Sequence, residues 1–172
     1  ALSSAASDVY KRQDYKGFIF LGLMNVEGEP KVIEYNVRMG DPETEVVMPR
    51  IQADLIQLFE ATARGELKTA RFAMDSRYCT TVMLVAKGYP GSYEKGKEIQ
   101  IGKVEGSLIF HAGTRREGEK ILTNGGRVIA VSSYGKTMQQ ALDLSYRNVK
   151  EITFEGKTYR GDIGKDLMKL EN

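Results

Sequence analysis

The sequence has one cysteine, one histidine, four prolines and no tryptophan, and these shortages narrow what the chain can be. A single cysteine, Cys79, rules out an intrachain disulfide, so we expect a reducing compartment, the cytoplasm. No apolar run is long enough to span a membrane, and residues 1–13 hold no signal-peptide core. The net charge of +2 gives no reason to expect nucleic acid as a partner.

The chain is long enough for one ordinary domain or two small ones. His111 is the only histidine, and no Ser-His-Asp or Cys-His arrangement is evident. A lone histidine at a strand end is more often structural than catalytic. The sequence therefore gives no reason to expect a protein nucleophile.

Several charged and polar side chains lie within a strand-like stretch at 31–38 and the turn that follows it. Its β-branched and aromatic residues fit a pleated sheet, and side chains alternate along a strand. Glu34, Asn36 and Arg38 therefore leave one face, and the turn at 40–43 adds two carboxylates. Mg²⁺ prefers hard oxygen ligands, so Glu34 and Asn36 are candidate metal ligands, and Arg38 can hold an anion. A sheet with one solvated face shows the same alternation, and that alternative stays open.

The spacing Glu-x-Asn-x-Arg-x-Gly-Asp-Pro-Glu at 34–43, with Met-Pro-Arg at 48–50, resembles the phosphoribosylamine–glycine ligases, also called glycinamide ribonucleotide synthetases. That family has the ATP-grasp fold. The resemblance covers roughly residues 14 to 170 and includes several motifs in the family's order. These further motifs lie at 15–24, 88–91, 110–114, 123–128 and 159–164.

The resemblance implies ATP-dependent joining of glycine to 5-phosphoribosylamine through glycyl phosphate, with Mg²⁺ or Mn²⁺ held by Glu34 and Asn36. Many ATP-grasp enzymes carry another metal carboxylate on the preceding strand. Residues 21–23 contain no acid here, so we expect fewer protein ligands to the metal, centred on Glu34 and Asn36. We assign Arg38 to the reacting carboxylate or acyl phosphate, because its side chain leaves the strand on the same side as Glu34 and Asn36.

The remaining substrate contacts are expected from four residues. Asp41 and Glu43 are assigned to the amine and the ribose hydroxyls, because ionised carboxylates are acceptors only. Arg115 and Arg127 are assigned to the ribose phosphate, provided that the strand ends carrying Thr114 and Arg127 are neighbours. On the sequence alone, solvated surface arginines are the alternative to a phosphate site, and that alternative stays open.

We expect an α+β chain with three parts. Residues 1–13 are expected to be a disordered leader that does not match the family, and 14–76 to be the closing part of an ATP-grasp domain with its connection. Residues 77–172 are expected to form a small β-rich C-terminal domain. The missing N-terminal part of the enzyme then becomes a partner. Another ATP-grasp ligase or carboxylase of purine synthesis, or a non-catalytic binding module, remains an alternative.

Local patterns predict the principal elements. Residues 16–24, apolar enough to be covered on both faces, and 31–38 are expected to form a hairpin. An amphipathic helix is expected over 51–64 and a second one after a Thr137 cap. Asn-Gly favours tight hairpin turns, so we expect the strands within 120–132 to pair with one another.

Overall fold

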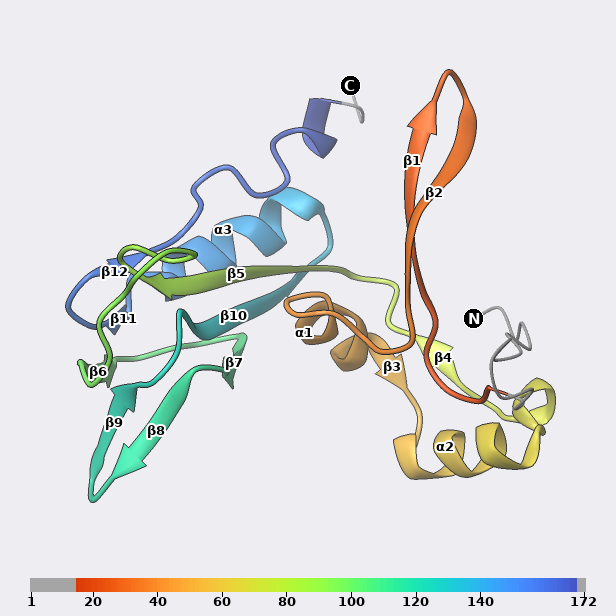
Figure 1. Ribbon diagram of the computed structural model, residues 1–172, viewed down its shortest axis with the longest axis horizontal. Helices are drawn as coiled ribbons and strands as arrows, with labels where there is room; N and C mark the ends of the chain where they lie inside the picture. The colour runs from red at the N-terminus through yellow and green to blue at the C-terminus, as the bar shows by residue number, and fades with distance from the viewer. Residues whose placement is uncertain (1–14, 170–172) are drawn as a thin grey trace. The chain divides into compact units, whose positions relative to one another are not determined.

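The computed structural model describes residues 15–169, and the expectation for residues 1–13 lies outside that range. The described residues fall into two compact units, one containing residues up to 44 and 51–75, the other containing 45–50 and the residues from 76 onward. Helices and strands are both present, so the predicted α+β class is confirmed (Figure 1). In chain order the elements are β1 (Phe20–Val26), β2 (Glu29–Asn36), α1 (Thr44–Val47), η1 (Met48–Arg50), β3 (Ile51–Gln52), α2 (Leu55–Arg64), η2 (Leu67–Thr69), β4 (Ala73–Met74), β5 (Tyr78–Ala86), β6 (Glu98–Ile101), β7 (Ser107–His111), β8 (Thr114–Glu117), β9 (Lys120–Thr123), β10 (Arg127–Gly135), α3 (Met138–Val149), β11 (Ile152–Thr153), β12 (Lys157–Thr158) and η3 (Leu167–Lys169).

The predicted hairpin of the first unit is confirmed: β1 pairs antiparallel with β2, and the ladder shifts between Gly22 and Leu23. The expectation that β1 is covered on both faces is wrong for the described residues. Leu23 and Met24 are each more than half exposed, and so is Ile33 on β2. The two strands form a separate two-stranded sheet. Apolar side chains on both faces of this sheet are therefore left exposed.

Helix α2 begins later than the predicted residue 51. Asp54 caps it, because its Oδ1 accepts the backbone N–H groups of Ile56 and Gln57 at 2.9 and 3.1 Å. Ile51–Gln52 instead pairs with Ala73–Met74 as β3 and β4.

Every helix between residues 15 and 169 is too short or too polar to span a membrane.

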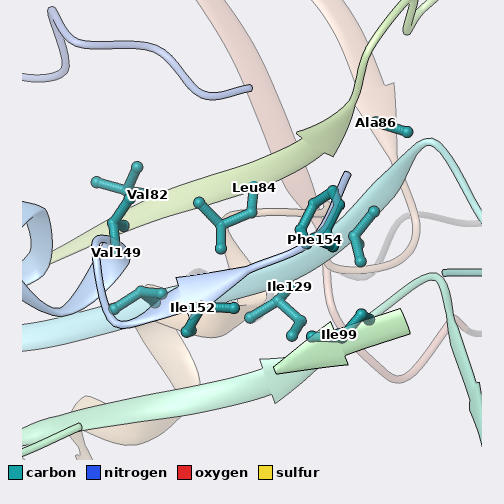
Figure 2. Close-up of a cluster of buried hydrophobic side chains, with 10 residues drawn as sticks. Val82, Leu84, Ala86, Ile99, Ile129, Val149, Ile152 and Phe154 are labelled. Carbon is teal, nitrogen blue, oxygen red and sulfur yellow. The ribbon is translucent and has the colours of Figure 1, made fainter. Parts of the chain in front are cut away.

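The second unit contains two four-stranded antiparallel sheets, ordered β12-β5-β10-β7 and β11-β6-β9-β8. Its core gathers buried apolar side chains from both sheets and from the segment after α3. Figure 2 shows Leu84 of β5 and Ile129 of β10 lying close to Ile152, Phe154 and Ile99. The burial of these side chains is the main apolar contribution to the unit's stability.

Helix α3 packs against β5 and β10, as Figure 1 also shows. The predicted cap is confirmed, because the Thr137 hydroxyl accepts the N–H of Gln140. The buried face of α3 carries two polar residues, Ser145 and Asn148. The Ser145 hydroxyl donates to Ser133 Oγ at 2.8 Å and lies 3.0 Å from Thr80 Oγ1. Helix and strands are therefore joined by satisfied polar contacts as well as by apolar packing.

The predicted pairing of the strands within 120–132 is wrong. Strand β9 pairs with β6 and β8, whereas β10 pairs with β5 and β7. The N–H groups of Asn124 and Gly125 donate to the carbonyl of Gly113, at 2.7 and 3.0 Å, so they do not close a hairpin. The Asn-Gly turn therefore carries the chain from one sheet to the other.

Candidate functional site

The metal candidates lie on strand β2 as the alternation predicts. Glu34 stands opposite Gly22 and Asn36 stands opposite Phe20, so both side chains leave the same face of the hairpin. Glu34 is exposed and Asn36 is half-buried. Within residues 15–169, neither side chain makes a hydrogen bond or an ion pair. The carboxylate and amide oxygens are therefore open to a hard cation.

Two protein oxygens suit Mg²⁺, which usually keeps several waters and shares the rest of its shell with substrate phosphates. No group of three or more His, Cys, Asp or Glu residues that could hold a metal occurs among the described residues. The donor set of Glu34 and Asn36 thus fits a cation that arrives with a nucleotide. It does not fit a structural metal held by protein ligands alone.

The turn after β2 brings further charged groups close in sequence to the metal candidates. Arg38 is exposed, and its Nη1 donates to the carbonyl of Met39 at 3.3 Å. The N–H of Thr44 donates to the carbonyl of Gly40 at 3.0 Å and closes the turn. The exposed carboxylate of Glu43 lies against Gly40. A cationic group and acidic groups therefore follow strand β2 directly.

Three sequence motifs of the second unit meet in space. The N–H of Ala86, before the Gly-Tyr-Pro-Gly loop, donates to the carbonyl of Gly126 at 2.8 Å. The N–H of Gly113 donates to the carbonyl of Arg127, also at 2.8 Å. A Cβ on Gly113 would lie 2.6 Å from the Gly125 Cα, so the two backbones touch. The loops at 88–91, 112–114 and 124–127 therefore form one cluster.

This cluster makes the strand ends that carry the predicted phosphate ligands neighbours. Arg127 begins β10, is half-buried and stands opposite Val85. Arg115 lies on β8, where its Nη2 pairs with Glu117 Oε2 at 3.1 Å and its side chain is about half exposed. The backbone just before β8 therefore lies beside the start of β10. The Arg115 guanidinium, however, points to the Glu117 carboxylate of its own strand.

A cavity of about 620 Å³ lies beside the first of these loops, lined in part by Lys87, Gly88 and Tyr93. Lys97 at its wall pairs with Glu94 at 2.8 Å and Glu155 at 3.0 Å. The hydrogen bonds that Lys97 donates to these carboxylates raise the pKa of Lys97, and the one to Glu94 lowers the pKa of Glu94. No local pattern predicts this cluster, because Glu155 comes from a distant turn.

Comparison with known protein families shows to which family the chain belongs. Residues 79–166 match the family model of the phosphoribosylglycinamide synthetase C domain, which is more than half of the chain. The chain belongs to the phosphoribosylglycinamide synthetase family. Residues 3–44 match the ATP-grasp (A) domain of the same synthetase, a match that reaches into the first 13 residues.

Relatives of this synthetase family are considerably longer than the chain. The phosphoribosylamine–glycine ligase of Chlorobaculum tepidum is 46% identical over 154 residues, covering 87% of this chain and 36% of the relative. The ligase of Caldanaerobacter subterraneus is 40% identical over 150 residues, with the same two coverages. The chain therefore spans little more than a third of the length of these ligases.

Solved structures support the fold. The crystal structure of the Thermotoga maritima phosphoribosylamine–glycine ligase matches with a TM-score of 0.71 at 39% identity, covering 87% of this chain and 37% of that chain. A biotin carboxylase domain of the Hydrogenobacter thermophilus 2-oxoglutarate carboxylase matches with a TM-score of 0.53 at 17% identity, covering 77% of this chain and 30% of that one. The second likeness shows the fold alone.

Proposed function

We propose that this chain is part of a longer phosphoribosylamine–glycine ligase. The whole enzyme joins glycine to 5-phosphoribosylamine with ATP and releases glycinamide ribonucleotide, ADP and phosphate in purine synthesis, in the cytoplasm. The observation that carries the proposal is the pair of unengaged oxygen ligands, Glu34 and Asn36, on one strand face of a chain from the synthetase family. The relatives that bear this ligase's name support the reaction.

Glu34 and Asn36 hold Mg²⁺ or Mn²⁺ together with ATP phosphate oxygens. When bound, the ion neutralises the charge that develops during phosphoryl transfer. The two side chains fix its place because they project from successive outward positions of one strand. No protein nucleophile is needed, since positioning and electrostatics supply most of the catalysis in such reactions.

The other charged residues recognise substrate. Arg38 holds the glycine carboxylate and then glycyl phosphate, because a guanidinium binds such anions in bidentate fashion. Asp41 and Glu43 accept hydrogen bonds from the amine and the ribose hydroxyls. Arg115 and Arg127 hold the ribose phosphate, supported by the neighbouring backbones of their strand ends.

The rest of the enzyme is the proposed macromolecular partner of this chain. The relatives carry almost two thirds of their length beyond the matched region. We propose that this remaining part supplies most of the nucleotide pocket, and that the 172 residues alone make no product.

The test uses the complete ligase that contains this chain. With ATP, Mg²⁺, phosphoribosylamine and glycine, it should form glycinamide ribonucleotide, detected by mass spectrometry, and release ADP only when both substrates are present. Omitting glycine, or replacing it with bicarbonate, serves as the matched control. ADP release that needs bicarbonate would instead identify a carboxylase, and ATP turnover indifferent to either substrate would contradict the ligase reaction.

A further inference from the structure

The glycine opposite the proposed metal carboxylate packs directly against its side chain. Gly22 pairs with Glu34 across the hairpin, and the ladder shifts directly after it. A Cβ built on Gly22 would lie 2.9 Å from the Glu34 Cγ and 3.6 Å from the Glu34 backbone N. The first distance is shorter than Cβ atoms show in real proteins, so any side chain at this position must displace Glu34.

The backbone itself does not require glycine at this position. Gly22 is not among the glycines with positive φ, so an alanine could adopt its conformation. Glycine inside a strand also weakens it, since it loses more chain entropy on folding and packs no side chain. What this glycine provides is the space into which the first carbons of the Glu34 side chain extend.

A second carboxylate of the motif shows the same arrangement. A Cβ on Gly40 would lie 2.3 Å from the Glu43 Oε2, and Gly40 also lacks a positive φ. Gly161 is a useful contrast, because it too lacks a positive φ and nothing lies within 4 Å of its Cβ position. An acidic side chain therefore lies close against Gly22 and Gly40 but not against Gly161; outside the motif, Gly102 has the Glu151 Oε2 3.0 Å from its Cβ position.

We propose that Gly22 is a positioning residue for the metal site: it lets the Glu34 side chain lie across β1, with its carboxylate on the same face as the Asn36 amide. The proposal rests on the proposed metal role of Glu34. A methyl group on Gly22 would push the Glu34 Cγ away from β1 and change the χ1 rotamer of Glu34. The carboxylate would then leave the position that it shares with Asn36.

The first experiment measures metal binding in the complete ligase. Electron paramagnetic resonance of free Mn²⁺, in the presence of ADP, should show affinity reduced about ten- to a hundredfold in Gly22→Ala, as is usual when a residue that orients a metal ligand is lost. Gly161→Ala is the matched control and should bind Mn²⁺ like the wild type. The KM for glycine should stay unchanged in both variants.

Glu34→Gln separates this inference from the proposed function. If Glu34→Gln binds Mn²⁺ as tightly as the wild type, the metal assignment itself is wrong. If Glu34→Gln loses Mn²⁺ while Gly22→Ala keeps wild-type affinity, the metal assignment stands and the positioning role of Gly22 is overturned.

A stability cycle tests the same contact without metal. Gly22→Ala should lower the unfolding temperature of the chain in the wild-type background. It should have no such effect in a Glu34→Ala background, where the Cγ has been removed. An equal loss in both backgrounds would mean that the methyl group disturbs the hairpin without acting through Glu34, and would overturn the inference.

Discussion

The ring of Tyr89 fills the space where a Cβ of Gly126 would lie: that atom would be 2.1 Å from the Tyr89 Cδ2. The contact joins two motifs that are far apart in the chain, the Gly-Tyr-Pro-Gly loop and the turn before β10. Gly126 is buried and has no positive φ, so its lack of a side chain serves packing.

Gly126→Ala should therefore destabilise the chain by overpacking. Forcing a methyl group into such a contact typically costs about 1–3 kcal/mol. Urea unfolding followed by circular dichroism measures the change. Gly161→Ala, where the added methyl group meets open space, is the matched control. A Gly126→Ala variant as stable as that control would show that the Tyr89 ring moves aside freely.

Arg127→Ala tests the proposed phosphate site. Losing a charge-assisted hydrogen bond to phosphate typically costs about 1.5–3 kcal/mol, or roughly ten- to a hundredfold in affinity. In the complete ligase, the KM for phosphoribosylamine should rise by about that factor while the KM for ATP stays nearly constant. An effect on ATP, or on neither substrate, would place the phosphate pocket elsewhere. Arg116→Ala is the matched control, since Arg116 is an exposed residue on β8 that we assign to no substrate.

The isolated 172-residue chain should bind ATP weakly or not at all. Strand β2 with the proposed metal ligands is present, but the matched region covers only 36% of the Chlorobaculum tepidum ligase. Isothermal titration of the chain with ATP and Mg²⁺ should show no submicromolar site. The complete ligase under the same conditions serves as the positive control. Submicromolar affinity in the isolated chain would mean that the nucleotide pocket lies within these residues.

Lys157 makes a pH-dependent contribution to the stability of the second unit. Its Nζ donates to the carbonyls of Val149 and Ile152, at 3.0 and 2.5 Å, and partial burial lowers its pKa from the usual 10.5. The unfolded chain therefore binds more protons over the alkaline range just below 10.5, so this group's contribution to stability rises with pH there.

The comparison with Lys157→Met isolates that contribution from other titrating groups. Both proteins are unfolded with urea between about pH 8 and pH 10, near the ordinary lysine pKa. Over this range, the unfolding free energy of the wild type should increase with pH relative to that of the variant. The same pH dependence in both proteins would show that the Lys157 ammonium is as well solvated in the folded chain as in the unfolded one.

Short-range patterns predicted the parts of the fold that depend on neighbouring residues. The face shared by Glu34 and Asn36 follows from strand alternation alone. The start of α3 follows from the Thr137 hydroxyl, which satisfies a free N–H of the first turn. Asp54 offered the same kind of signal for α2, and reading it as a cap would have placed the helix start correctly.

Long-range contacts account for the elements that the sequence did not predict. The Asn-Gly turn is a local hairpin signal, but its N–H groups are taken by Gly113 from another loop, and β9 finds partners in β6 and β8. The Lys97 cluster depends in the same way on Glu155 from a distant turn. Such contacts are set by tertiary structure, which overrides local preference.

Glu34 is the proposed ligand of the metal that accompanies ATP. Glu34→Gln keeps the size of the side chain and removes its charge. A metal ion supplies several kcal/mol of transition-state stabilisation, so turnover of the complete ligase should fall by about a hundredfold or more. Glu29→Gln is the matched control, because Glu29 lies at the other end of β2 as an exposed residue opposite Val26.

The decisive measurement is the rate of glycinamide ribonucleotide formation by these two variants at ordinary Mg²⁺ concentration, with circular dichroism to show that both are folded. Glu34→Gln should be folded and nearly inactive, while Glu29→Gln should turn over like the wild type. Near-normal turnover of Glu34→Gln would contradict the metal role of Glu34.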